Sequence, residues 1–62
     1  MLTNKYLFVH SSNPKNTTIL SANSLGEAIR KCGKSFKYIL ETTTTRTTKY
    51  DNKFNILWRK NK

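Results

Sequence analysis

The side chains best equipped for chemistry in this sequence are its basic ones. Twelve Lys and Arg stand against three Asp and Glu, so the 62 residues carry a formal net charge of +9. This excess predicts an anionic partner, and clustered Lys and Arg on a strongly basic domain are typical of contacts with nucleic-acid phosphates. The predicted contacts come from a helix, a Thr-rich hairpin and a C-terminal strand: Arg30, Lys34, Arg46, Lys49, Lys53, Arg59 and Lys60.

The Thr-rich stretch and the single Trp give this nucleic-acid hypothesis two concrete forms. Residues 42–48 are all Thr except Arg46. Hydroxyl and guanidinium groups both donate to phosphate oxygens, so a protruding basic hairpin could enter a groove as a β-ribbon. Threonine is also simply a strand former, which is the plainer interpretation of the run. The second form is base stacking on Trp58, whereas most of the other aromatic rings are expected in the core.

Groups for catalysis or metal binding are sparse, so we expect a binding protein rather than an enzyme. The three carboxylates are assigned to a helix cap (Glu27), a strand end (Glu41) and a turn (Asp51), which leaves no pair for general acid and base catalysis. His10 has no nucleophile or carboxylate at a catalytic spacing. One Cys and one His cannot close a four-ligand zinc site, and Cys32 is expected as a buried, inert thiol on the helix. We therefore predict no metal and no cofactor.

A chain of this length is expected to form one domain, residues 1–62, with a basic, frayed tail at 60–62. Ordering costs about 1.5 kcal/mol per residue, so a single thin core gives only marginal stability. The longest apolar run, residues 6–9, is far shorter than the ~18 residues of a membrane helix, so we expect no membrane partner and a cytoplasmic location. The bias toward Lys, Asn and Thr without Gln is typical of AT-rich genes, as in viruses and mobile elements.

The sequence predicts an α+β fold of order ββαββ, an antiparallel four-stranded sheet with one helix packed on one face. The predicted strands are residues 5–12, 17–21, 36–41 and 54–60. Ser24 and Glu27 form a capping box, and Gly33 stands where a left-handed residue would end the helix. The helix has one apolar stripe at the i, i+3, i+4, i+7 positions Leu25, Ala28, Ile29 and Cys32.

The larger apolar set on the strands has even numbers and is predicted to face the helix: Tyr6, Phe8, Leu20, Phe36, Tyr38, Leu40, Phe54, Ile56 and Trp58. Directly paired residues share a face of the sheet, so two even-numbered residues can pair across a hairpin only if the sum of the two paired residue numbers is even. A loop of three residues gives an even sum, whereas a loop of two residues gives an odd one. We therefore predict loops 13–15 and 51–53. Their predicted pairs are Phe8 with Leu20, Tyr50 with Phe54, Thr48 with Ile56, and Arg46 with Trp58.

One helix cannot cover both faces of such a sheet, so some odd-numbered aliphatic residues are predicted to be exposed. The interface candidates are Leu7, Val9, Ile39 and Leu57. Three interpretations stay open: strand formers shielded by Lys stems, a homodimer contact, or a partner surface. The alternative function is accordingly a small inhibitor or adaptor that docks an acidic protein through its basic face and a strand edge. DNA and RNA are equally compatible with the main hypothesis.

Overall fold

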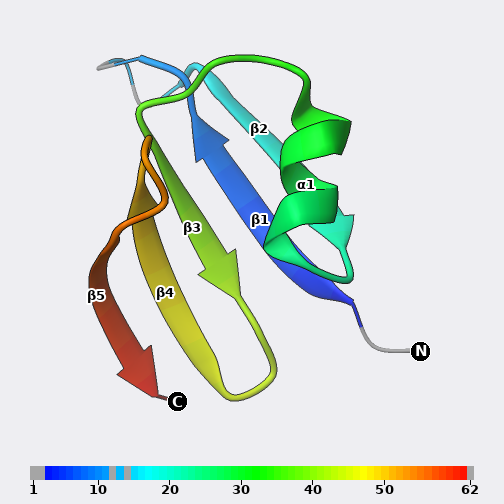
Figure 1. The fold of residues 1–62 in the computed structure, drawn as a ribbon, viewed down its shortest axis with the longest axis vertical. Coiled ribbons are helices and arrows are strands. Elements are labelled where there is room, and N and C mark those ends of the chain that lie inside the picture. The colour runs from blue at the N-terminus through cyan, green and yellow to red at the C-terminus, as the bar shows by residue number, and fades with distance from the viewer. Residues whose placement is uncertain (1–2, 12, 14, 62) are drawn as a thin grey trace.

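The computed structural model describes residues 3–11, 13 and 15–61, which form a sheet of five strands and one helix (Figure 1). In chain order the elements are β1 (Asn4–Val9), β2 (Thr17–Ala22), α1 (Leu25–Cys32), β3 (Tyr38–Thr42), β4 (Arg46–Asp51) and β5 (Ile56–Asn61). The antiparallel sheet has the order β2-β1-β3-β4-β5, and α1 packs on one face over β1 and β2. The α+β class with a single covering helix is confirmed, but the predicted strand number of four is wrong.

The additional strand, β4, begins within the Thr-rich stretch, at Arg46, and continues to Asp51. The stretch 42–48 is predicted as a Thr-rich hairpin arm that leads from the third strand to the fourth, whereas the structure has a separate strand, β4, between β3 and β5. The β-branched threonines favour this extended conformation. A tight turn leads into β4: the Thr43 N–H donates to the Arg46 carbonyl at 2.8 Å, and the Thr43 hydroxyl accepts from the Arg46 N–H at 3.1 Å. One hydroxyl thus helps to form the hairpin between β3 and β4.

Helix α1 matches its prediction closely. The Ser24 hydroxyl accepts from the Glu27 N–H at 3.3 Å, and Gly33 adopts the left-handed conformation (φ 64°) that ends the helix. Lys31 Nζ lies 3.2 Å from a Glu27 carboxylate oxygen, the expected i, i+4 pair. Ala28 is fully buried, and the other stripe residues pack against the core. Within the part of the chain that the structure describes, no helix is long and apolar enough to cross a membrane.

The two glycines of this segment are expected to respond oppositely to alanine. Gly33→Ala should lower the free energy of unfolding by about 1 kcal/mol, because an L side chain is strained at φ 64°. Gly26→Ala should raise it by about 0.5 kcal/mol, because Gly26 is helical and alanine loses less backbone entropy. An added Cβ meets nothing within 4 Å at either position, so the difference between the two variants reports the backbone conformation and not side-chain packing. Urea unfolding followed by circular dichroism measures both, and equal signs would contradict the assignment.

The core lies between α1 and the first three strands. Its fully buried aromatic residues are Tyr6 and Phe8, and Phe36 packs edge-on against Phe8 with ring centroids 5.3 Å apart. The even-numbered pattern therefore holds on β1, and Phe36 joins it from the segment before β3. These aromatics, with Ala28 above them, fix the side of the sheet that faces the helix.

On β3 the predicted pattern is wrong by one residue. Phe8 is paired with Ile39, and directly opposite residues share a face of the sheet. Ile39, predicted to be exposed, is therefore a fully buried core residue, whereas Tyr38 and Leu40 face away from α1. The β1 and β3 strands are not joined by a hairpin, so no loop length constrains the parity of their pairing.

The first hairpin has the predicted parity but a longer loop. Tyr6 is paired with Leu20, and Phe8 with Thr18, so the expected pairing of Phe8 with Leu20 is shifted by two residues. Strand β1 ends at Val9 rather than at residue 12. Residues 12 and 14, part of the predicted strand and loop, lie outside the described residues.

The second hairpin has a three-residue loop, as predicted, but one position further along. The Asp51 N–H donates to the Asn55 carbonyl at 3.0 Å and closes a loop of residues 52–54. The Asp51 carboxylate accepts from the Lys53 and Asn55 N–H groups at 2.8 and 2.9 Å. Phe54 takes the left-handed position (φ 66°) that normally follows a turn in such loops. Asp51 is thus the turn residue that was expected.

A bulge then changes the face on which Trp58 lies. Tyr50 is paired with Ile56, but the next pair is Lys49 with Trp58, so Leu57 is an additional residue in β5. The predicted pairs Tyr50 with Phe54 and Thr48 with Ile56 are wrong because the loop lies one position further along the chain. The predicted pair Arg46 with Trp58 is wrong because the extra residue reverses the parity beyond it. Trp58 therefore shares the face of Lys49, opposite the helix. Strand β5 ends at Asn61, one residue beyond the predicted strand end at residue 60, and residue 62 lies outside the described part.

Candidate nucleic-acid interface

The face of the sheet opposite α1 is covered by no other element among the described residues. Two rows of its side chains run across all five strands, and a shorter row beside them consists of Thr17, Val9, Tyr38 and Asp51. The first row, which we call the Lys-Thr row, consists of the consecutive cross-strand partners Ser21, Lys5, Thr42, Thr47 and Lys60. Those of the second, the apolar row, are Ile19, Leu7, Leu40, Lys49 and Trp58. We call the two rows together the open face. Each of these two rows runs across all five strands because every strand contributes one residue to it.

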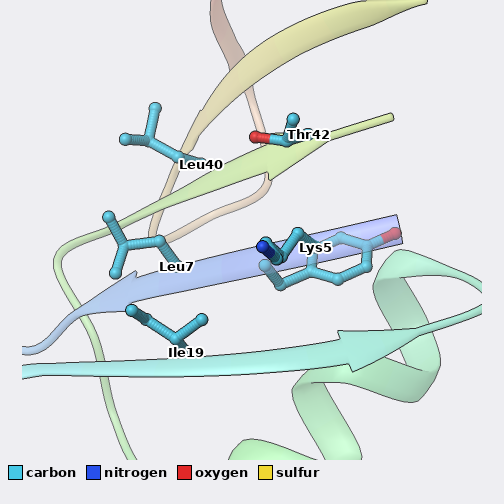
Figure 2. A pocket seen from close by; sticks show the side chains of 6 residues that line it. Lys5, Leu7, Ile19, Leu40 and Thr42 are labelled. Atoms are coloured by element: carbon cyan, nitrogen blue, oxygen red, sulfur yellow. The ribbon is translucent and has the colours of Figure 1, made fainter. Parts of the chain in front are cut away.

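A shallow apolar hollow lies in the open face over β2, β1 and β3 (Figure 2). Its volume is ≈ 200 Å³, and its lining combines the aliphatic side chains of Leu7, Ile19 and Leu40 with Lys5 and Thr42. Figure 2 shows the three aliphatic side chains on neighbouring strands, with Lys5 and Thr42 toward one end of the hollow. The hollow therefore offers an apolar floor with an ammonium group and a hydroxyl beside it.

Aromatic and basic groups alternate at the β4 and β5 end of the open face. Lys49 Nζ lies 4.2 Å from the centroid of the Tyr38 ring, a cation-π contact that holds this ammonium group against the sheet. Trp58 is the cross-strand partner of Lys49 and is 41% exposed. An exposed indole ring directly beside an ammonium group can stack on a flat apolar surface while the cation binds an anion.

The structure divides the seven predicted basic residues among different surfaces. Lys49 and Lys60 lie on the open face, and Lys53 lies in the loop between β4 and β5. Arg59 pairs with Thr48, and its Nε donates to the Thr48 hydroxyl at 3.4 Å on the helix side of the sheet. Arg46 also lies on the helix side of the sheet. Arg30 lies on α1, and Lys34 follows the end of that helix. The seven residues do not form one continuous binding surface.

Lys5 is a basic residue of the open face that does not belong to the predicted set of seven. Its place depends on β1 lying between β2 and β3, which brings Lys5 beside Thr42. Its odd number, shared with Leu7, was the available signal, because it placed both side chains on one face of the first strand. The odd-numbered face is accordingly predicted to be both aliphatic and basic.

The predicted interface residues also separate. Leu7 lines the hollow, but Val9 is only 4% exposed and Ile39 lies in the core. Leu57 is 53% exposed and belongs to β5, an edge strand in which every residue is exposed. The accessible apolar surface is therefore made by Leu7 with its hollow and by β5, not by one odd-numbered face.

On the helix side of the sheet, Glu41 is the centre of a hydrogen-bonded cluster. Its carboxylate accepts from the Tyr6 hydroxyl at 2.6 Å and from the Tyr50 hydroxyl at 3.3 Å. Burial, and then the hydrogen bond to Glu41, raises the pKa of Tyr6 to about 12. Burial and the Glu41 charge also raise the pKa of Tyr50. The cluster joins β1, β3 and β4, and we assign it a structural role.

This cluster predicts a specific loss of stability in alkali. The Tyr6 phenol has a pKa of about 12 in the folded chain against an ordinary value of 10.0, so folding favours its protonated form. Its contribution is complete below pH 10 and is lost as the pH rises from 10 to 12, with a slope of at most about 1.4 kcal/mol per pH unit. Tyr6→Phe should lower the free energy of unfolding by about 1 kcal/mol at pH 7, because it removes the hydrogen bond to Glu41. The variant should then show a shallower decline above pH 10 in urea unfolding, and an unchanged slope would refute this role.

The other groups considered for chemistry have structural partners. His10 Nε2 lies 2.7 Å from the Thr18 hydroxyl and its Nδ1 2.8 Å from the Ser35 carbonyl, so both ring nitrogens are engaged. Cys32 is half-buried against the core. Among residues 3–11, 13 and 15–61, no group of three His, Cys, Asp or Glu side chains is placed to hold a metal ion.

Comparisons with protein families, curated proteins and solved structures find no match.

Proposed function

We propose that this protein is a nucleic-acid-binding module whose open face contacts phosphates. The observation that carries the proposal is the alignment of Lys5, Thr42, Thr47 and Lys60 in one row, with Lys49 in the next. Ammonium and hydroxyl groups are the usual protein donors to phosphate oxygens. No carboxylate belongs to either row. Asp51 lies in the adjacent row of the same face, and its carboxylate accepts hydrogen bonds from the Lys53 and Asn55 N–H groups.

The dimensions of the row support several phosphate contacts. Lys5 and Lys60 are separated by three strand spacings, about 14 Å. One strand of a duplex presents a phosphate about every 3.4 Å along the axis, so several phosphates fall within this span. Binding of this kind is electrostatic and independent of base sequence, and it does not distinguish DNA from RNA.

A second candidate function is supported by the exposed edge strand. The backbone of β5 has a strand partner on one side only, and its side chains include exposed Ile56 and Leu57 beside Arg59 and Lys60. An acidic protein segment could add a strand along this edge, with carboxylates beside the basic side chains. This corresponds to an inhibitor or adaptor that docks on a partner protein, and it depends on β5 rather than on Lys5.

The proposed function is tested by titrating fluorescently labelled single-stranded DNA, duplex DNA and structured RNA with the protein. Measurements at ~50 and ~200 mM salt should show the affinity for at least one probe falling by an order of magnitude or more. The fall arises because each phosphate contact releases condensed counterions. Weak binding to all three probes at the lower salt concentration would reject the proposal and favour the protein partner.

A further inference from the structure

The arrangement of the strands excludes the β-ribbon form of duplex recognition. A major groove about 12 Å wide admits a helix or a two-stranded ribbon. The β3 and β4 hairpin is paired on both sides almost to its tip, since Lys5 of β1 pairs with Thr42 and Asn61 of β5 pairs with Arg46. The resulting five-stranded sheet spans about 19 Å between its outer strands, which is too wide for the groove. Only the turn at residues 43–45 extends beyond the paired region.

The open face carries apolar and aromatic surface in addition to its lysines. Phosphate contacts alone do not need this surface, and the bases of a duplex keep their flat faces stacked inside the helix. An unpaired nucleotide presents both a phosphate and an apolar base face, as the hollow with Lys5 beside it requires. Lys49 and Trp58 repeat the same combination of cation and apolar surface.

We infer that the open face binds an unpaired strand of DNA or RNA laid across the β-strands, with one base over the hollow at Leu7 and Leu40 and another on Trp58. The inference deepens the proposed function and rests on it. The phosphates lie toward Lys5, Lys49 and Lys60. Leu40 and Trp58 are two strand spacings apart, about 10 Å, with Lys49 between them on β4. Two separate base contacts joined by a basic centre fit one extended strand.

Trp58 provides the readout, because it is the only tryptophan in the chain. The probes are a ten-residue oligothymidylate, an abasic oligomer with the same number of phosphates, and a duplex. We expect oligothymidylate to quench the Trp58 fluorescence and to bind about tenfold more tightly than the abasic oligomer, since stacking contributes to binding at each base. The duplex should bind more weakly and without quenching. An oligouridylate tests RNA as the source of the strand, and quenching by either polymer supports the inference.

One variant and its matched control test the stacking contact at Trp58, and the abasic oligomer separates stacking from charge. Trp58→Ala should weaken oligothymidylate binding about tenfold, measured by anisotropy of the labelled oligomer, and leave abasic binding unchanged. Ile56→Ala is the matched control, because Ile56 is also exposed on β5 but pairs with Tyr50 on the other side of the bulge. It should change neither affinity, and circular dichroism checks that both variants fold.

The outcomes distinguish this inference from the proposed function. Equal affinity for the abasic oligomer and oligothymidylate, or a preference for the duplex, would overturn the single-strand inference while salt-dependent binding kept the proposed function. Duplex binding that is lost on substitution of Arg30 and Lys34 would also overturn the single-strand inference, and it would assign recognition to the helix segment. No binding to any probe at ~50 mM salt would overturn both.

Discussion

Simultaneous substitution of Lys5, Lys49 and Lys60 by glutamate is expected to weaken nucleic-acid binding at least about 100-fold at ~200 mM salt. The three ammonium groups share one face of the sheet, and each substitution replaces a phosphate contact with a repelling carboxylate. With about three fewer phosphates neutralised, the slope of log affinity against log salt should become shallower by about 2 for a single-stranded probe. Titrations at several salt concentrations measure both quantities.

The matched control reverses Arg30, Lys34 and Lys53, which lie on the helix segment and in the β4 to β5 loop. Both triple variants change the net charge equally, so they separate the position of the charge from its amount. We expect the control to keep a wild-type salt slope and to lose only a small part of the affinity through long-range repulsion. Equal losses in the two variants would show that net charge alone governs binding and would remove the open face as the site.

Replacing Phe8 by alanine is expected to unfold the protein at 25 °C. Phe8 is 0% exposed and packs between the sheet and the helix with Phe36 against its ring. Truncating a buried phenylalanine costs about 3–5 kcal/mol through lost burial and the cavity left behind. A domain of this size has only about 3–5 kcal/mol of total stability. Far-UV circular dichroism should therefore show loss of the native spectrum without denaturant.

Phe54→Ala is the control for this substitution, since it makes the same chemical change at a side chain that is 47% exposed. Phe54 contacts Phe36 with ring centroids 6.0 Å apart, so we expect a loss of about 1 kcal/mol or less. Urea unfolding midpoints compare the two variants with the wild type. A Phe8→Ala protein that melts cooperatively near the wild-type midpoint would contradict the core described above.

Local features of the fold were predictable from the sequence. The Ser24 cap, the apolar stripe and the Gly33 terminus lie within ten consecutive residues, so the interactions that form them are all local in the sequence. The three-residue loop of the second hairpin followed from alternation of apolar side chains in the same way. The loop lies one residue further along because the Asp51 carboxylate accepts hydrogen bonds from the Lys53 and Asn55 N–H groups. The hydrophobic pattern of the sequence contains no information about these hydrogen bonds.

Non-local features were not predictable by the same means. The pairing of β1 with β3 sets whether Ile39 or Leu40 is buried, and it is determined by packing under α1 rather than by any turn. The bulge beside Lys49 has no marker such as glycine, yet it decides the face of Trp58. Among the site residues, the charge of Lys49 and Lys60 was evident, but their alignment with Lys5 required the complete strand order.

The strand order also determines how this chain can reach its folded state. The hairpin of β1 and β2 and the meander of β3, β4 and β5 each form from neighbouring segments, whereas Val9 and Tyr38, 29 positions apart, belong to the pairing that joins them. Closing that large loop is the main entropic cost of reaching the transition state. We therefore expect substitutions at the junction of β1 and β3 to change mainly the folding rate, and substitutions in the outer strand β5 to change mainly the unfolding rate.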